Sequence, residues 1–364
     1  MRIGIDGLLL GSGYTGVEQS VEGLVAALPA AGPQHEFLLA CTSQFDADTT
    51  LAMPRRAVPL SGRLRRIVYE QTRLSSLLAD CDLLHAPAYV MPLNWRKPSV
   101  LTVYDLIALQ FPQWCKRSNA LHYGLVLPRS LRRASAIIAP SHTVANAISE
   151  RFPKVGEKVR VIVMGVDEAF RPASPDQVAE LLRALAIQTP YLLYVGNLEP
   201  KKNVAAIVAA FDQIADRLPH SLVLHGAWAW RCDEVRRSIE TARHPERIIL
   251  LPGYLPRPQL ASLYTGADLL VQWSLYEGFG LPPLEAMACG TPAVVSDGGA
   301  LPEVAGPAAC VVPLGPPERL AEAVLALLAD EAQLADLRRR GLIHAAAFTW
   351  QAHARAAVAL YEES

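Results

Sequence analysis

The most informative segment of this 364-residue chain is Tyr276-Glu-Gly-Phe-Gly-Leu-Pro-Pro-Leu-Glu-Ala-Met-Ala-Cys-Gly-Thr-Pro292. Pro282 and Pro283 suit the first turn of a helix, where a missing N–H leaves no hydrogen bond unmade. Gly290 followed by Pro292 supplies a C-terminal stop. The apolar run at residues 269–272 precedes this segment and is typical of a strand. The segment therefore predicts a strand, a glycine-rich loop and a very short helix, in that order.

Short β-branched or leucine-rich runs alternate with longer helical patterns on both sides of this unit. In the first half of the chain, strands are predicted at residues 2–6, 37–42, 82–85, 99–104, 136–139 and 159–163. In the second half, they are predicted at residues 191–195, 222–225, 248–251, 269–272, 293–296 and 309–312. Helical patterns lie at residues 17–28, 64–78, 118–133, 141–151, 317–328, 331–347 and 350–361. This alternation indicates an α/β fold in which each half forms its own doubly wound parallel sheet.

The boundary between the halves is marked by a break in the periodicity. The break falls at Phe170-Arg-Pro-Ala-Ser-Pro175, where Ser174 and Pro175 offer a helix start. We therefore predict domains at residues 1–170 and 171–347, followed by a C-terminal helix within 348–364. Residues 1–170 carry 18 basic and 14 acidic side chains, whereas the remainder carries 16 and 21. The first domain is thus the one expected to meet an anionic acceptor or surface.

The composition excludes several classes of protein. With 51% hydrophobic and 19% charged residues, the chain can bury large cores and is not disordered. A net charge of -1 gives no pull toward nucleic acid, and we expect no such partner. The six cysteines are at least 21 residues apart, which fits neither a zinc site nor a disulfide scaffold. No apolar run approaches about 18 residues and the chain opens on a strand pattern, so we expect a cytoplasmic protein without membrane spans.

Two carboxylates indicate a binding site around the predicted short helix. Glu277 precedes this helix and Glu285 lies within it, so the two can hold separate pairs of hydroxyl groups. The positive end of the helix adds the backbone N–H groups of four residues, Gly278, Phe279, Gly280 and Leu281. Such a site suits a polyhydroxylated, anionic ligand. The alternative is that the acidic residues only cap the helix.

A second cluster follows the strand predicted at residues 191–195, in Gly196-Asn-Leu-Glu-Pro-Lys-Lys-Asn-Val204. Lys201 and Lys202 are adjacent cations at the start of a helix, where they would repel the helix dipole unless a diphosphate lies there. The alternative is an exposed basic turn.

The first domain contains a better-known pattern, Gly11-Ser-Gly-Tyr-Thr-Gly16, which obeys G-x-G-x-x-G between a strand and a helix. Three interpretations are open: the loop contacts a phosphate, it is a plain glycine-rich turn, or it forms a nicotinamide site. The last is disfavoured, because the second strand ends without an acidic residue for the ribose hydroxyls. Asp46-Ala-Asp48 fits a solvated loop better than a metal site, and the nine histidines form no ligand cluster, so no protein-bound metal is predicted.

Together these motifs resemble the retaining GT-B glycosyltransferases of family 4, and in particular the O-antigen mannosyltransferases that use GDP-mannose. Glu277 and Glu285, with seven residues between them, carry the resemblance most specifically. Further matches lie at residues 194–203, 275–292, 301–305 and 348–350, and looser ones at residues 1–6, 15–16, 82–92, 102–112 and 161–167. The resemblance thus covers nearly the whole chain.

The resemblance implies a fold and a set of donor-binding residues. Two Rossmann-like domains would face a cleft, with the nucleotide-sugar held mainly by the second and the acceptor by the first. The last helix would cross back onto the first domain. Lys202 would neutralise the diphosphate, Glu285 would hold the ribose, and Glu277 with the loop amides would hold the transferred sugar. Lys201 would share the phosphate role, because Asn197 stands where many members have Arg or Thr. The predicted donor-binding set is completed by Gly13, Thr15, Gly16, Gly196, Asn197, Gly226, Gly253 and Tyr254.

On the acceptor side, the resemblance implies His85, Tyr104 and Asp105. Tyr104 stands before Asp105 where the family has a His that lines the reaction centre. Tyr104 and Asp105 therefore join Lys202 and Glu277 as the predicted catalytic residues.

Two predicted helices of the first domain carry clusters of basic residues. These are Arg63, Arg65, Arg66, Arg73, Lys116, Arg117, Arg129, Arg132 and Arg133. One interpretation is peripheral docking on an anionic membrane surface, which would bring a lipid-linked saccharide to the enzyme. The other is an ordinary solvated helix face.

The predicted activity is transfer of a hexose, in first place mannose from GDP-mannose, to a hydroxyl group with retention of configuration. The acceptor would be a saccharide, or a lipid-linked saccharide, of a bacterial surface glycan. No cofactor or metal is expected, since the nucleotide-sugar is a substrate. The alternatives are a nucleotide-sugar epimerase on the same fold and a catalytically weakened nucleotide-sugar-binding subunit, for which Tyr104 is the positive hint.

Overall fold

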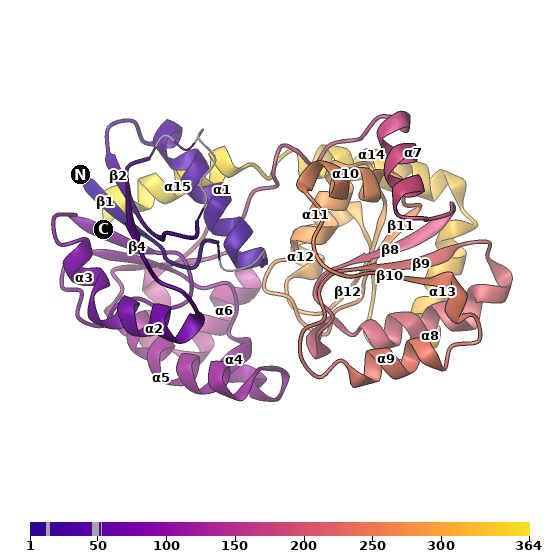
Figure 1. Ribbon diagram of the computed structural model, residues 1–364, viewed down its shortest axis with the longest axis horizontal. Helices are drawn as coiled ribbons and strands as arrows, with labels where there is room; N and C mark the ends of the chain where they lie inside the picture. Colours follow the sequence, from indigo (N-terminus) through magenta and orange to yellow (C-terminus); the bar gives the residue numbers. More distant parts are fainter. Residues whose placement is uncertain (12–14, 46–50, 52) are drawn as a thin grey trace. The chain divides into compact units, whose positions relative to one another are not determined.

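The computed structural model describes residues 1–11, 15–45, 51 and 53–364. The chain packs as two compact units (Figure 1): unit 1 comprises Met1–Gly165 and Phe348–Ser364, and unit 2 comprises Val166–Ala347. The chain thus enters unit 2 after Gly165 and leaves it after Ala347. The sequence analysis placed these two changes after residues 170 and 347.

In the described part of unit 1, seven parallel strands form one sheet in the order β3-β2-β1-β4-β5-β6-β7. The strands are β1 (Arg2–Gly7), β2 (Glu36–Thr42), β3 (Arg55–Val58), β4 (Leu83–Ala86), β5 (Ser99–Thr102), β6 (Ala136–Ala139) and β7 (Val159–Val161). The order reverses between β1 and β4, the position at which doubly wound sheets bind ligands. The sequence analysis missed β3, because this edge strand is partly exposed and lacks a continuous apolar run.

The helices of unit 1 are α1 (Gly16–Ala31), α2 (Arg63–Thr72), α3 (Leu74–Leu77), α4 (Ile107–Gln110), α5 (Arg117–Arg133), α6 (His142–Arg151) and α15 (Trp350–Glu363). Two 3₁₀ turns are η1 (Pro112–Trp114) and η2 (Pro153–Lys158). The single helix predicted at residues 64–78 is wrong, because Arg73 interrupts it with a φ of −124°. Beyond this break, Leu74 and Leu78 are fully buried.

The C-terminal helix α15 packs against α1 in unit 1, as the resemblance implied. Its first residue, Trp350, is 9% exposed and lies against two glycines. A Cβ atom on Gly23 of α1 would lie 2.2 Å from the Trp350 ring, and one on Gly165 would lie 2.3 Å from the Trp350 backbone nitrogen. The contact therefore requires residues without a side chain at both positions.

Unit 2, described throughout, contains a six-stranded parallel sheet in the order β10-β9-β8-β11-β12-β13. The strands are β8 (Tyr191–Val195), β9 (Ser221–His225), β10 (Ile248–Leu251), β11 (Leu269–Gln272), β12 (Ala293–Ser296) and β13 (Cys310–Val312). Here the order reverses between β8 and β11, so a ligand is expected beyond the carboxyl ends of these two strands. The predicted α/β fold with two doubly wound parallel sheets is confirmed.

The helices of unit 2 are α7 (Pro175–Ala184), α8 (Val204–Ile214), α9 (Asp233–Glu240), α10 (Arg257–Thr265), α11 (Leu281–Ala288), α12 (Leu301–Ala305), α13 (Pro317–Leu328) and α14 (Glu331–Ala345). The 3₁₀ turns are η3 (Pro200–Lys202), η4 (Ala215–Arg217), η5 (Pro245–Arg247) and η6 (Gly306–Ala308). Figure 1 shows α8, α9 and α13 on one face of the sheet and α7, α10 and α11 on the other. The predicted helix start at Ser174 is confirmed by a capping box with Gln177. Among the described residues, no helix combines the length and the apolarity needed to cross a bilayer.

Candidate active site

The loop that follows β8 carries the predicted phosphate-binding lysines. It runs from Gly196 through η3 to Asn203, which adopts a left-handed conformation before α8 begins. The loop lies against the loop that follows β9, and a Cβ atom on Gly226 would lie 2.1 Å from the carbonyl oxygen of Gly196. A glycine at position 226 is therefore required for the two loops to meet.

Lys202 on this loop forms an ion pair with Glu277, which follows β11. The Lys202 Nζ lies 2.6 Å from the Glu277 Oε1, and the two side chains are only 14% and 8% exposed. The loops are also joined through the backbone, because the N–H of Leu275 donates to the carbonyl of Lys201 at 2.7 Å. The ion pair forms because β8 and β11 are neighbours in the sheet.

Glu277 is held ionised by its surroundings. Burial raises the pKa of its carboxyl, but the charges of Lys202 and Lys201 and hydrogen bonds from Lys202 and Ser274 outweigh burial, so the pKa is lowered. Its backbone is held too, because the N–H of Ala300 donates to the Glu277 carbonyl at 2.8 Å. Removing one partner of a buried ion pair leaves the other uncompensated, which costs about 3–5 kcal/mol.

The predicted short helix is α11, and it begins beside this ion pair. Gly280 is its N-cap residue, with a φ of 113°, and no side chain caps the helix. Its first-turn N–H groups therefore have no capping side chain, and the positive end of the helix dipole lies in the same loop as Glu277.

Glu285 on α11 has a different environment. Its side chain is 6% exposed, and its Oε2 accepts a hydrogen bond from the Tyr264 hydroxyl of α10 at 2.8 Å. Burial raises the pKa of Glu285 to about 7, although the Tyr264 hydrogen bond and the Arg257 charge lower it. The two glutamates of the motif thus differ in charge near neutral pH, because only Glu277 has a lysine partner.

On the ribose-binding role predicted for Glu285, the Glu285→Gln variant should chiefly weaken nucleotide binding, because a carboxylate that holds ribose hydroxyls acts equally in the ground and transition states. Calorimetry should show wild-type affinity rising as the pH increases through about 7, where Glu285 ionises, and no such rise in the variant. Steady-state kinetics should show a raised KM at nearly constant kcat. Glu322→Gln on the exposed face of α13 is the matched control. A large loss of kcat at unchanged KM would contradict the ribose role.

The remaining donor-side residues of unit 2 gather at the same edge of the sheet. The Tyr254 hydroxyl, which follows β10, donates to the Asn197 Oδ1 at 3.3 Å. Gly253 has a φ of 96°, and apart from its chain neighbours no heavy atom lies within 4 Å of where a Cβ would be. Lys201 pairs with Glu199 at 3.6 Å. The structure therefore brings the predicted residues of unit 2 together along the carboxyl ends of β8 to β11.

In unit 1, Thr15 and Gly16 begin α1. The Thr15 hydroxyl accepts the Glu18 N–H at 3.2 Å as the N-cap, and Gly13 lies outside the described residues. Asp105 is half-buried; its Oδ1 accepts the Ile107 N–H and its Oδ2 accepts the Tyr89 hydroxyl, each at 2.9 Å.

Tyr104 is buried, and its ring contacts that of Tyr89 with centroids 5.6 Å apart. Burial raises the pKa of Tyr104, so its hydroxyl stays protonated. Tyr89, which the sequence analysis missed, therefore connects the two predicted acceptor-side residues. Its left-handed φ of 68°, unusual for a bulky residue, gives no signal in the sequence.

His85, the third predicted acceptor-side residue, is held by hydrogen bonds inside unit 1, and its role toward an acceptor stays a prediction. His85 is fully buried, its Nδ1 lies 2.6 Å from the Tyr361 hydroxyl and its Nε2 lies 2.8 Å from the Thr102 Oγ1. Burial lowers its pKa to about 3, so the ring is neutral. The return of α15 to unit 1 places Tyr361 against this ring.

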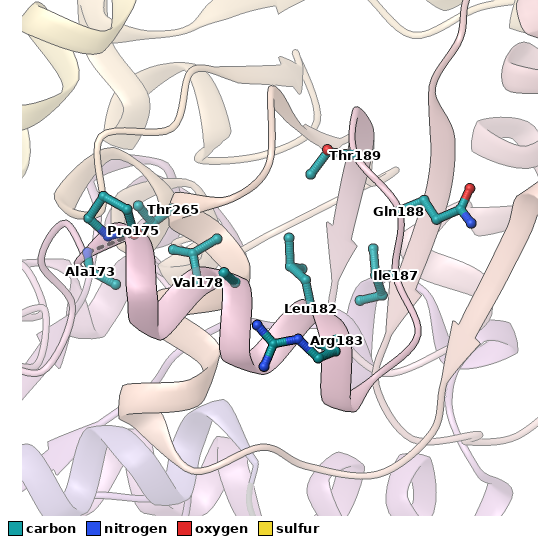
Figure 2. Close-up of a pocket in the computed structure, with 10 residues that line it drawn as sticks. Ala173, Pro175, Val178, Leu182, Arg183, Ile187, Gln188, Thr189 and Thr265 are labelled. Atoms are coloured by element: carbon teal, nitrogen blue, oxygen red, sulfur yellow. Dashed lines mark hydrogen bonds between the residues drawn. The ribbon is translucent and has the colours of Figure 1, made fainter.

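A surface pocket lies along α7, apart from the residues described so far. Figure 2 shows its lining residues, with labels on Ala173, Pro175, Val178, Leu182, Arg183, Ile187, Gln188, Thr189 and Thr265; Ala179 completes the lining. None of the predicted site residues lines this pocket. Among the described residues, no group of three or more His, Cys, Asp or Glu side chains could hold a metal ion, and Asp46 and Asp48 lie outside those residues.

Two models of known protein families match this chain. Residues 14–170 match the Glycosyltransferase Family 4 model and residues 179–343 match the Glycosyl transferases group 1 model. The fold is that of Anabaena HepE in complex with UDP-glucose, with a TM-score of 0.79 and 18% identity over 100% of both chains. The chain belongs to the GT-B glycosyltransferases, with a family 4 domain followed by a group 1 domain.

Its relatives include two mannosyltransferases of Escherichia coli. The chain is 28% identical over 305 residues to O-antigen chain mannosyltransferase B, covering 83% of this chain and 79% of the relative. It is 29% identical over 288 residues to the serotype-specific mannosyltransferase WbdA, covering 77% of this chain and 35% of the relative. The chain thus spans about a third of the length of WbdA.

Proposed function

We propose that this glycosyltransferase moves mannose from GDP-mannose to a hydroxyl group of a surface saccharide, with retention of configuration. The observation that carries the proposal is the buried pair of Lys202 and Glu277 at the carboxyl ends of β8 and β11. A lysine cation there suits a diphosphate, and a fixed carboxylate beside it suits sugar hydroxyls. The names of the two E. coli relatives support mannose as the sugar and a surface glycan as the product.

The main requirement of the proposed reaction is stabilisation of the negative charge on the leaving diphosphate. As the bond between the sugar and the diphosphate breaks, negative charge grows on the leaving group, and Lys202 with the first-turn N–H groups of α11 would stabilise it. The acceptor hydroxyl would attack from the face that the diphosphate leaves, which retains the configuration. Asp105 and Tyr104 are the residues of unit 1 that we assign to the acceptor.

The donor is tested by a thermal-shift screen of GDP, UDP and ADP and their sugars. A nucleotide at 100 times its dissociation constant adds about 2.7 kcal/mol of stability, so the preferred base should give the largest shift. Incubation of GDP-mannose with an O-antigen saccharide should then give a product whose new linkage is α by NMR. Stabilisation by UDP-sugars alone, or a β linkage, would contradict the proposal.

We also propose that transfer is independent of divalent metal ions, because Lys202, Lys201 and the N-terminus of α11 can neutralise the diphosphate. Activity should therefore persist in excess EDTA at the level seen with added Mg²⁺. A known metal-dependent transferase assayed alongside confirms that the chelator is effective. Complete loss that Mg²⁺ or Mn²⁺ restores would show that the diphosphate is neutralised by a metal instead.

A further proposal is that α2 and α5 dock on an anionic membrane surface. Each presents two exposed aliphatic side chains one turn apart, Leu64 and Val68 at 75% and 53%, and Leu121 and Leu125 at 67% and 52%. The Arg63 guanidinium donates to the Asn119 side chain, so the first turns of the two helices contact each other. Exposed basic residues flank these apolar pairs at Arg65, Arg117, Arg129 and Arg132.

Sedimentation with anionic liposomes should therefore be strong at low salt, because each basic residue near the surface adds about 1 kcal/mol. Replacing Leu64 and Leu121 by Ser, or Arg65, Arg117 and Arg132 by Ser, should release the protein. Leu342→Ser in unit 2 is the control, at 40% exposure. Equal sedimentation of all variants would favour a soluble acceptor.

A further inference from the structure

Gln272, the last residue of β11, is a polar residue where the rest of the strand is Leu-Leu-Val. Its side chain is fully buried, and its Nε2 donates to the Ser274 Oγ at 3.0 Å and to the Glu277 Oε1 at 3.5 Å. Its Oε1 is also buried and has no hydrogen-bond partner in the fully described unit 2. A buried carbonyl oxygen without a donor therefore lies next to the proposed active site.

The orientation of this amide is decided by its neighbours. The Ser274 hydroxyl donates its proton to the Glu277 Oε1 at 2.8 Å, so it can only accept from Gln272. The Glu277 carboxylate can likewise only accept. The NH₂ group of Gln272 must therefore face these two residues, which leaves its Oε1 on the side without a partner.

The arrangement costs stability. A buried carbonyl without a hydrogen-bond partner lowers the stability of the folded protein, because the group has lost its contact with water. An apolar side chain of the same shape would leave the stability nearly unchanged. The gain is at Glu277, because three donors converge on its Oε1: the Lys202 Nζ at 2.6 Å, the Ser274 Oγ at 2.8 Å and the more distant Gln272 Nε2. These hydrogen bonds from unit 2 all go to Oε1, which leaves Oε2 as the oxygen for a ligand.

We propose that Gln272 and Ser274 are positioning residues, which orient the Glu277 carboxylate so that its Oε2 accepts a hydroxyl of the transferred sugar. This rests on the proposed function, in which Glu277 holds that sugar. It predicts that Gln272 acts on recognition of the sugar and not on recognition of the nucleotide. It also predicts that stability and activity respond to its replacement in opposite directions.

The test compares Gln272→Met and Ser274→Ala with two controls, Leu270→Met on the same face of β11 and Ser262→Ala, whose hydroxyl donates to the backbone within α10. Gln272→Met should melt at or above the wild-type temperature, yet lose about 10- to 100-fold in kcat/KM, the scale of a misplaced reacting group. Calorimetry should show weaker binding of GDP-mannose by both variants, with binding of GDP unchanged. The two controls should keep the wild-type melting temperature, the wild-type kcat/KM and the wild-type affinities for GDP-mannose and GDP.

The outcomes separate the inference from the proposed function. A wild-type protein that binds GDP-mannose without transferring mannose would refute the function, while the ratio of GDP-mannose to GDP affinity would still measure the role of Gln272. Wild-type kcat/KM and an unchanged affinity ratio in Gln272→Met would overturn the inference. A lowered melting temperature with equal losses for GDP and GDP-mannose would also overturn it, because it would assign Gln272 a purely structural role.

Discussion

Replacement of Lys202 by alanine is expected to lower kcat/KM by at least about 100-fold, the scale seen when one preorganised donor is removed from a developing negative charge. Lys202 lies on the loop after β8 and pairs with Glu277 at 2.6 Å. Its cation is in a largely buried position, where charge interactions are stronger than in water. The loss should fall on kcat, because the charge on the diphosphate grows as the bond breaks. Initial rates measured over a range of donor concentrations check this.

The same change is expected to destabilise unit 2, because it leaves the buried Glu277 carboxylate without its lysine. The double variant Lys202→Ala, Glu277→Gln should recover stability without recovering activity, which separates the two effects. Lys201→Ala is the matched control and should lose less, because Lys201 pairs with Glu199 at 3.6 Å instead of Glu277. Near-wild-type turnover by Lys202→Ala would remove its phosphate role.

Trp350→Ala is expected to lower the free energy of unfolding by about 3–5 kcal/mol, the usual cost of truncating a buried aromatic side chain. Trp350 is 9% exposed and begins α15, where its ring fills the space that Gly23 leaves on α1. The change creates a cavity between α15 and α1 within unit 1. Chemical denaturation, followed by the fluorescence of the other tryptophans, measures the loss.

The control for this prediction is Arg355→Ala on the exposed face of α15, which should change stability by less than about 0.5 kcal/mol. Gly23→Ala approaches the same contact from the other side and should also destabilise, because its Cβ would lie 2.2 Å from the Trp350 ring. If Trp350→Ala unfolds at the same denaturant concentration as the wild type, the packing of α15 on α1 does not contribute to stability.

The strands of unit 2 show how well the local sequence pattern predicts the bounds of a strand. The predicted bounds of β8, β11 and β12 agree with the structure, because parallel strands that are buried on both faces have continuous apolar sequences. The bounds of β10 agree as well, because this half-buried edge strand is also a continuous apolar run, Ile-Ile-Leu-Leu. The same reasoning fails for β3 at the edge of the unit 1 sheet, where Arg55 is exposed. It also fails at Arg73, where one non-helical residue divides a continuous helical pattern without any proline or glycine.

The fold class and most residues of the candidate site can be predicted from the sequence, because strand–loop–helix units and the charges in their loops are local features. Which of these residues meet depends on the tertiary structure. Lys202 pairs with Glu277 only because β8 and β11 are adjacent, although β9 and β10 lie between them in the chain. His85 lies beneath Tyr361 because α15 returns to unit 1, and Gln272 reaches Glu277 because the loop after β11 folds back toward the strand. The local sequence pattern predicts which residues are buried and which are exposed. The partner of a buried polar group depends instead on the order of the strands and on the return of α15 to unit 1, which no short stretch of sequence encodes.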